Sequence, residues 1–351
     1  MFIHKRARRL LRQLSLPTPI QKYFSQDAWT LDLSNNTNPY AGVFAEYPDV
    51  LQAALKDQYI KKILELDGIE SRDITADNVL FTVGSLEGID LLLRTLGDPG
   101  QDSVCIPHPT FSAYEHWASL HDLKVIKVPL EGEDLNSFSV QEIIEINPKM
   151  VFLCTPNNPT GTLLEASLIP ALCEGLEGFV IVDEAYREFS KAGPCVSLLE
   201  KYDNLVILRT FSKAWGLAGL RCGVILAHPY LIYALRHTQL PFGFSTFAQQ
   251  KVKECLENSE ALQRSWEVLK ESRTHLIQEL GTLSAVTKVF PSETNFIFIL
   301  LKEFKKTMAL LKRENIFVAD WSSSFPKAIR VSVGTPEHNV RFLEIMRQAS
   351  L

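Results

Sequence analysis

One lysine lies in a polar loop between two short apolar runs. The runs at 205–208 and 224–226 are typical of buried strands, and Lys213 lies between them among hydroxyl-bearing and small residues. An ammonium group beside a core is costly to desolvate unless it is neutral or covalently engaged. Those conditions favour a lysine that forms a Schiff base, although a lysine in such a loop can also be simply solvated.

Other chemically capable side chains follow other apolar runs. The run at 179–182 leads into Asp183 and Tyr186, and Asn158 lies in a proline-rich and asparagine-rich segment after a further run. Phe111 comes shortly after a third run, where an aromatic ring can cover a planar ligand or pack in the core. Strands that alternate with helices form mostly parallel sheets, and ligands bind beyond the carboxyl ends of the strands. We therefore expect these side chains to lie at one edge of a sheet.

A glycine-containing turn at 84–88 connects a strand at 79–83 to a helix at 89–96. Backbone N–H groups at Ser85 and Leu86 would be free at this junction, where the positive end of the helix dipole also lies. The junction suits a phosphate group, although every strand–turn–helix unit contains a similar one.

Together these residues supply what one cofactor chemistry needs. An aldehyde cofactor that acts as an electron sink requires an amine, a carboxylate for its ring nitrogen, donors to its ring oxygen, a phosphate site and an aromatic cover. The candidates, in that order, are Lys213, Asp183, Tyr186 with Asn158, the turn at Ser85 and Leu86 with Thr210, Ser212 and Arg221, and Phe111.

The order and spacing of these motifs resemble the pyridoxal phosphate (PLP) aminotransferases of fold type I, class I and II. The motifs are Asn-Pro-Thr-Gly at 158–161, Asp-Glu-Ala-Tyr at 183–186, Ser-Lys at 212–213 with Arg221 following, and Ile-Arg-Val-Ser-Val-Gly at 329–334. Within this fold type, the segments 154–161 and 209–223 are most similar to the histidinol-phosphate aminotransferases. The resemblance covers nearly the whole chain.

The resemblance implies an α/β fold, in which a mostly parallel sheet flanked by helices forms a large domain beside a smaller α+β domain. It also implies that Lys213 binds PLP and then moves a proton, and that Asp183 pairs with the ring nitrogen. Tyr186 and Asn158 would hold the ring oxygen. The phosphate would be bound by Arg221, Ser212, Thr210 and the backbone at Ser85 and Leu86.

Substrate and partner residues also come from the resemblance. Arg330 is similar to the family's arginine that binds the substrate carboxylate through its planar fork. Tyr47 resembles the tyrosine that reaches the phosphate of the partner subunit's cofactor, which implies a homodimer. Asn38 resembles a loop asparagine near the substrate, and Tyr23 would contribute to the entrance of the site. The substrates would be a small amino donor and a 2-oxo acid.

Two departures from the family pattern bear on the substrate. Many members have an arginine that binds the substrate's phosphate where this chain has Ala319, and the segment at 39–47 is short. The leading expectation is transamination between L-histidinol phosphate and 2-oxoglutarate, a step of histidine biosynthesis. The alternatives are an aminotransferase for an unphosphorylated amino acid, such as an aromatic one, and a threonine-phosphate decarboxylase. A further alternative is a catalytically silent PLP-binding regulator. That function would require an added DNA-binding domain, and the intact Lys213 argues against it.

Length and composition exclude several other classes. The chain has 351 residues, of which 46 % are apolar, so we expect a globular protein large enough for two domains. The net charge of -5 argues against general nucleic-acid binding, and no stretch approaches the ~20 apolar residues of a membrane-spanning helix. The six cysteines are scattered, which favours free thiols in a reducing cytoplasm, and the histidines suggest no metal site.

We expect three regions along the chain. Residues 1–28 would form an N-terminal arm that begins with a basic amphipathic segment, 29–240 the large PLP-binding domain, and 241–351 the small C-terminal domain. In the small domain, residues 250–280 are expected to form one long helix, with strands at 295–300 and 329–333.

Overall fold

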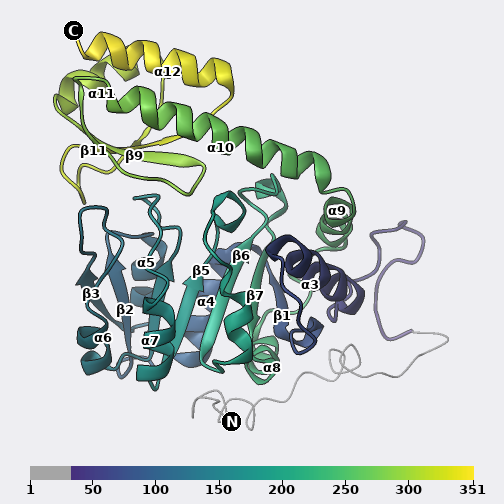
Figure 1. Ribbon diagram of the computed structural model, residues 1–351. Coiled ribbons are helices and arrows are strands. Elements are labelled where there is room, and N and C mark those ends of the chain that lie inside the picture. The colour runs from purple at the N-terminus through teal and green to yellow at the C-terminus, as the bar shows by residue number, and fades with distance from the viewer. Residues whose placement is uncertain (1–32) are drawn as a thin grey trace.

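A seven-stranded sheet forms the centre of the larger part of the structure, a computed structural model that describes residues 33–351 (Figure 1). The strand order is β1-β7-β6-β5-β4-β2-β3. The strands are β1 (Val79–Thr82), β2 (Ser103–His108), β3 (Lys124–Pro129), β4 (Met150–Cys154), β5 (Phe179–Asp183), β6 (Leu205–Thr210) and β7 (Gly223–Ala227). Strand β7 is antiparallel to β1 and β6, and the other pairs are parallel. The start of β7 therefore lies at the same edge as the carboxyl ends of its neighbours.

Helices cover both faces of this sheet, because its central strands are apolar on both sides. One face is covered by α3 (Ala53–Asp67), α6 (Val140–Ile146), α7 (Leu168–Gly175) and α9 (Thr246–Glu257). The other face is covered by α4 (Gly84–Leu96), α5 (Ala113–Leu120) and α8 (Pro229–Thr238). Short 3₁₀ helices complete the connections: η2 (Ala76–Asn78), η3 (Arg187–Phe189), η4 (Cys195–Glu200) and η5 (Ala218–Leu220). The mostly parallel α/β architecture expected from the sequence is confirmed.

Helix α4 begins earlier than the sequence indicates. The expected turn at 84–88 is already helical, because Gly84 has a φ of 75° and turns the chain directly out of β1. The side chain of Glu87 accepts a hydrogen bond from the N–H of Val83 and so ties down the start of the helix. Ser85 and Leu86 consequently lie in the first helical turn, at the edge of the sheet.

A four-stranded antiparallel sheet forms the smaller part, with the order β10-β11-β9-β8. Its elements are α10 (Glu260–Gly281), β8 (Val286–Val289), β9 (Phe296–Leu301), α11 (Phe304–Arg313), β10 (Ala319–Asp320), β11 (Ala328–Ser332) and α12 (Pro336–Ala349). In Figure 1 this part lies beyond one edge of the large sheet, and α10 runs across that edge.

The single helix expected at 250–280 is wrong, since the segment contains two helices. Helix α9 ends at Glu257, and the side chain of Asn258 donates a hydrogen bond to the carbonyl of Glu254 at 3.0 Å. Val252 and Leu256 of α9 are buried in the core of the large sheet. The domain division at residue 240 remains a proposal, and this packing moves the boundary that we propose into α10.

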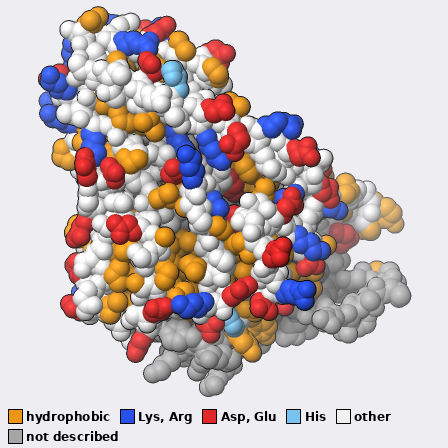
Figure 2. Space-filling view, in the orientation of Figure 1, with side chains coloured by type: hydrophobic (Ala, Val, Ile, Leu, Met, Phe, Trp, Pro, Cys, Tyr) orange, Lys and Arg blue, Asp and Glu red, His pale blue; other side chains and the backbone are white. Residues whose placement is uncertain are grey.

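Charged side chains of both signs are scattered among hydrophobic and other side chains on the surface shown in Figure 2, and Lys and Arg side chains gather near the junction of the two parts. Within residues 33–351, we find no helix that is both long and apolar enough to cross a membrane.

Candidate active site

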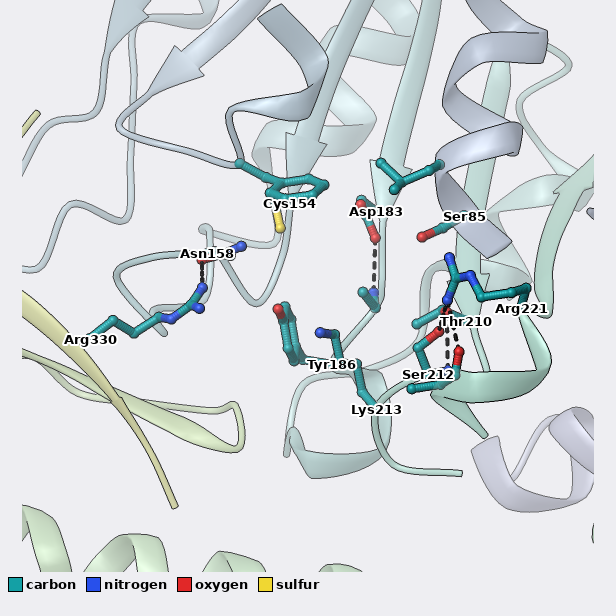
Figure 3. A pocket seen from close by; sticks show the side chains of 14 residues that line it. Ser85, Cys154, Asn158, Asp183, Tyr186, Thr210, Ser212, Lys213, Arg221 and Arg330 are labelled. Carbon is teal, nitrogen blue, oxygen red and sulfur yellow. Dashed lines mark hydrogen bonds between the residues drawn. The ribbon is translucent and has the colours of Figure 1, made fainter. Parts of the chain in front are cut away.

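A cavity of about 290 Å³ lies at the edge where the large sheet meets the small one (Figure 3). The loops after β5 and β6, the first turn of α4 and strand β11 all contribute side chains to it. The predicted residues that line it are Ser85, Leu86, Phe111, Asn158, Asp183, Tyr186, Thr210, Ser212, Lys213, Arg221 and Arg330. The chain therefore brings together residues that are up to 245 positions apart in the sequence.

Lys213 extends into the cavity from the loop after β6 (Figure 3). Its Nζ lies 5.7 Å from the centre of the Tyr186 ring. Burial lowers the pKa of Lys213, and the nearby positive charge of Arg330 lowers it further, whereas Asp183 opposes the change. The lowered pKa favours the neutral amine, which is the form that can attack a carbonyl carbon.

Asp183 lies at the end of β5 and is 3 % exposed. Its Oδ2 accepts a hydrogen bond from the hydroxyl of Tyr114 at 2.7 Å, and its Oδ1 accepts one from the N–H of Ala185 at 3.0 Å. Burial raises the pKa of Asp183 to about 6, although both donors and Lys213 act in the opposite direction. A buried carboxylate directed into the cavity can hold a protonated ring nitrogen by a charge-assisted hydrogen bond.

Tyr114 belongs to this site although no sequence pattern predicted it there. Tyr114 lies three residues after Phe111, and a spacing of three places both side chains on the same side of a helical turn. That spacing is the signal from which the contact between the two residues could have been expected.

A cluster of hydrogen-bond donors lies at the end of the cavity away from Arg330 (Figure 3) and suits a phosphate. The first turn of α4 presents Ser85 and Leu86, and the guanidinium of Arg221 donates to Ser212 Oγ at 3.4 Å and to the carbonyl of Ala218 at 3.0 Å. Thr210 Oγ1 accepts a hydrogen bond from the N–H of Ser212 at 3.2 Å. A helix N-terminus with an arginine beside it is a favourable environment for a dianion.

The backbone around this cluster has no room for larger side chains. A Cβ atom at Gly84 would collide with the guanidinium of Arg221, and one at Gly223 would collide with the backbone of Gly84. The start of β7 and the start of α4 therefore approach each other closely only because both positions are glycine. The donor cluster fits the phosphate of PLP, and Asp183 and Lys213 in the same cavity fit its ring nitrogen and its aldehyde.

Contacts among Arg330, Asn158, Tyr186 and Phe296 join the two sheets beside the cavity. Arg330 of β11 donates a hydrogen bond to Asn158 Oδ1, and its guanidinium carbon lies 4.9 Å from the centre of the Phe296 ring (Figure 3). Tyr186 packs edge-on against the same ring, with a centre-to-centre distance of 5.2 Å. Burial raises the pKa of Tyr186, so its hydroxyl stays a donor. The open side of Arg330 can accept an anionic substrate group.

An ion network that was not predicted from the sequence lies next to the cavity residues Asp183 and Thr210. Arg209, the residue before Thr210, is 4 % exposed and contacts Glu184 Oε2 and Asp67 Oδ2, each at 2.8 Å. Its charge is therefore compensated, as burial requires. The network connects the end of α3 to the two strands that carry Asp183 and the lysine loop.

Other predicted residues do not line the cavity of their own chain. Tyr47 is 49 % exposed and stacks on Phe242 with a ring-centre distance of 4.4 Å. Asn38 is exposed, and its side-chain oxygen accepts a hydrogen bond from the N–H of Tyr40 at 3.1 Å. Tyr23 and the expected N-terminal arm at 1–28 lie outside the described residues.

Cys154 also lines the cavity, although it was not among the residues predicted from the sequence. It is the last residue of β4 and the register partner of Asp183 on β5, so its position follows from strand pairing. Burial raises the pKa of its thiol, which therefore remains protonated. Across the part of the chain from 33 to 351, no group of His, Cys, Asp or Glu side chains forms a candidate metal site.

Known proteins resemble this chain over most of its length. The family model described as aminotransferase class I and II matches residues 35–345. Histidinol-phosphate aminotransferase of Cytophaga hutchinsonii is 33% identical, with 90% of each chain covered. The protein of the same name from Bacteroides fragilis is 35% identical, and the match covers 93% of this chain and 92% of the relative.

Solved structures show the same fold. The histidinol-phosphate aminotransferase from Clostridium acetobutylicum matches with a TM-score of 0.76 at 22% identity, covering 88% of this chain and 91% of the other. The corresponding protein from Sinorhizobium meliloti, in complex with pyridoxal-5'-phosphate, matches with a TM-score of 0.75 at 22% identity, covering 88% of this chain and 84% of the other.

Proposed function

The chain belongs to the aminotransferase class I and II family, and we propose that it acts as a histidinol-phosphate aminotransferase. The reaction would transfer the amino group of L-histidinol phosphate to 2-oxoglutarate, giving imidazole-acetol phosphate and L-glutamate. The family match and the solved structures confirm the fold type and the PLP-dependent enzyme class expected from the sequence. The observation that carries the proposal is the meeting of Lys213, Asp183, Arg221 and Arg330 in one cavity.

PLP supplies an aldehyde that captures the substrate amine and a ring that takes up electron density from the substrate carbon. In our proposal the Nζ of Lys213 would hold the cofactor, and the same amine would serve as the acid and base that moves a proton at the substrate carbon. The lowered pKa of Lys213 supports both tasks. Asp183 would keep the ring nitrogen of the cofactor protonated, and Arg221 with the first turn of α4 would hold its phosphate.

Arg330 binds the anionic group of each substrate in turn. Its planar fork matches the oxygen pair of a carboxylate or a phosphate. The face of the Phe296 ring packs against the guanidinium in a cation–π contact. Asn158 and Tyr186 lie beside it and bind the ring oxygen of the cofactor. Both substrates can use one site because the two half-reactions follow each other.

We propose that the enzyme is a homodimer in the cytoplasm. Phe44 is 59 % exposed and Tyr47 is 49 % exposed, and Leu240 nearby in the fold is 71 % exposed. Aromatic and aliphatic side chains exposed in this way are common at subunit interfaces. A dimer would carry Tyr47 to the cofactor phosphate of the partner subunit and would cover this apolar surface.

A second candidate function is favoured by the substitution at Ala319. This residue is the register partner of Arg330 on the neighbouring strand, so Arg330 has no second arginine opposite it, where many family members have one. One cation suffices for the carboxylate of an unphosphorylated amino acid. An aminotransferase for such a donor, including an aromatic one, is therefore the alternative that the experiment must separate.

A half-reaction assay tests the proposal. The PLP-loaded protein is mixed separately with L-histidinol phosphate, L-glutamate, L-phenylalanine and L-threonine phosphate, and formation of pyridoxamine phosphate is followed by absorbance. We expect rapid conversion with histidinol phosphate and with glutamate. Conversion with glutamate or phenylalanine but not with histidinol phosphate would support the second candidate instead. Release of carbon dioxide from threonine phosphate would contradict both.

A further inference from the structure

Tyr114 is a buried residue that contacts two different parts of the cofactor cavity. Its hydroxyl donates to Asp183 Oδ2 at 2.7 Å, and the edge-to-face contact of its ring with Phe111 has a centre distance of 5.6 Å and an angle of 89°. The Tyr114 ring also stacks on Phe152 with a centre distance of 5.1 Å. The side chain is 0 % exposed, so packing fixes the position of its hydroxyl.

The hydroxyl supplies one of the two hydrogen bonds that orient Asp183. The other comes from the N–H of Ala185, which donates to Oδ1 at 3.0 Å. Each carboxylate oxygen thus receives one donor from the protein and keeps a lone pair for a further donor. The carboxylate cannot rotate without losing both bonds, and its remaining acceptor capacity is directed into the cavity.

The same bond acts on the charge of Asp183. Burial raises the pKa of Asp183 to about 6, and the hydrogen bond from Tyr114 is the strongest influence in the opposite direction. Burial and the Asp183 charge raise the pKa of Tyr114 well above its usual range, so its hydroxyl donates and does not ionise. If Asp183 were protonated, its carboxyl would carry no negative charge. It could then not neutralise the positive charge of a protonated ring nitrogen.

We propose that Tyr114 is a positioning residue that keeps Asp183 ionised and correctly oriented toward the ring nitrogen of the cofactor. Through its edge-to-face contact Tyr114 also fixes the position of Phe111, which would cover the ring of the cofactor. This inference rests on the proposed role of Asp183. It predicts that removal of one oxygen atom, outside the cavity lining, changes the protonation of the bound cofactor.

The experiment compares Tyr114→Phe with Tyr202→Phe in the full-length protein loaded with PLP that carries ¹⁵N in its ring. Tyr202 is a matched control, because its hydroxyl also donates to a carboxylate at 2.7 Å, that of Glu174, and neither residue lines the cavity. The ¹⁵N chemical shift of the ring nitrogen is followed as a function of pH. The cofactor dissociation constant and the thermal midpoint are measured in parallel.

In Tyr114→Phe the loss of the hydrogen bond raises the proton affinity of Asp183, which favours transfer of the shared proton from the ring nitrogen to the carboxylate. We therefore expect the ratio of protonated to neutral ring nitrogen to fall by roughly tenfold relative to the unchanged protein. Turnover should fall by roughly tenfold for the same reason, and the KM for the amino donor should change little. Tyr202→Phe should titrate like the unchanged protein. A purely structural role of Tyr114 would lower the thermal midpoint and leave the titration of the ring nitrogen in place.

Two further variants separate the possible outcomes. Asp183→Asn should abolish the protonated ring signal near neutral pH; if it does not, the proposed role of Asp183 is wrong. If Asp183→Asn has that effect and Tyr114→Phe has none, the inference about Tyr114 is overturned alone. Should Tyr114→Phe fail to fold, Tyr114→His, which retains a ring N–H donor, must keep the titration of the unchanged protein within about half a pH unit. A larger shift in the folded His variant overturns the inference.

Discussion

The guanidinium of Arg330 donates a hydrogen bond to the amide oxygen of Asn158 across the junction between the two sheets (Figure 3). Arg330 belongs to β11 of the small sheet, and Asn158 belongs to the loop that follows β4 of the large one. The amide is neutral, so it orients the guanidinium without cancelling its charge. The charge of Arg330 therefore remains available for an anion. In the function that we propose, this hydrogen bond would fix the anion-binding group relative to the loop that holds the cofactor.

Replacement of Arg330 by lysine tests this arrangement. Lysine keeps the charge but loses the planar fork, so we expect the KM for L-glutamate to rise by roughly 10-fold to 100-fold. The dissociation constant of PLP should stay nearly the same. The matched control is Arg341→Lys, because Arg341 pairs with Glu314 on the outer surface of the same domain. An unchanged KM in Arg330→Lys would rule out this arginine as the main anion-binding group.

Lys213 can be compared with another buried lysine. We expect Lys213→Ala to lose turnover and to carry no cofactor after borohydride reduction, as shown by mass spectrometry of the intact protein. Lys56 is 5 % exposed, and burial lowers its pKa to about 8, yet it does not line the site. Lys56→Met should therefore retain both turnover and reducible cofactor. Covalent cofactor in Lys213→Ala would show that a different amine holds PLP.

Much of the site could be predicted from the sequence because its residues follow strands that are buried on both faces. Such strands appear as continuous apolar runs, so the positions of Asp183 and Lys213 directly after them indicated one edge of a sheet. Tyr114 and Arg209 could not be assigned in this way. Tyr114 lies on a helix and reaches Asp183 only through strand order, and Arg209 is inside β6, where its partners Asp67 and Glu184 come from distant segments.

The helix boundaries show a similar limit. Periodicity indicated a helix near 250–280, but the break at Asn258 depends on where α9 must leave the core of the large sheet and α10 must reach the small one. Likewise, the start of α4 at Gly84 depends on the close approach of β7, which is formed by residues far along the chain. Tertiary packing decided both positions.

Gly84→Ala should weaken cofactor binding, because its Cβ would displace the guanidinium of Arg221 from the phosphate cluster. We expect the dissociation constant of PLP to rise by at least about tenfold, the loss of one charge-assisted hydrogen bond. Gly68 has a similar φ of 66°, and no atom lies within 4 Å of its ideal Cβ. Gly68→Ala therefore carries the backbone strain alone and should bind PLP normally, although with a lower thermal midpoint. Equal affinities in both variants would contradict the steric explanation.

The charge of Asp183 should destabilise the protein when PLP is removed. The pKa of this carboxyl rises from 3.8 to about 6 on folding, so the folded chain binds the proton more tightly than the unfolded chain. Stability is therefore lost as the pH rises between these values, by up to about 3 kcal/mol. Asp183→Asn should make the cofactor-free protein more stable at pH 7.5 and similar in stability near pH 3.8.

Urea unfolding of the cofactor-free proteins across this pH range measures the effect on the free energy of unfolding. Asp203→Asn is a suitable control, because this carboxyl is half exposed and lies outside the cavity. A stability difference between Asp183→Asn and the unchanged protein that does not grow between pH 4 and pH 6 would show that Asp183 is not desolvated.

The absence of a second arginine beside Arg330 predicts how the substrate range can be shifted. Ala319 of β10 is the direct register partner of Arg330, and directly opposite residues of an antiparallel pair project from the same face of the sheet. An arginine introduced at Ala319 would therefore lie next to Arg330, where two forks can share the oxygens of one phosphate. We expect Ala319→Arg to lower the KM for L-histidinol phosphate by roughly tenfold and to change the KM for L-glutamate much less.

The reason for this difference is charge. A phosphate monoester carries close to two negative charges at pH 7 and gains from a second cation, whereas a carboxylate carries one and is already paired by Arg330. Without a ligand, the two guanidinium groups would repel each other, so the thermal midpoint of Ala319→Arg should fall slightly and recover when inorganic phosphate is added. Ala319→Gln, which adds length without charge, is the control. If Gln and Arg at this position lower the KM for histidinol phosphate equally, contact and not charge is responsible, and the missing arginine does not limit recognition of the phosphate.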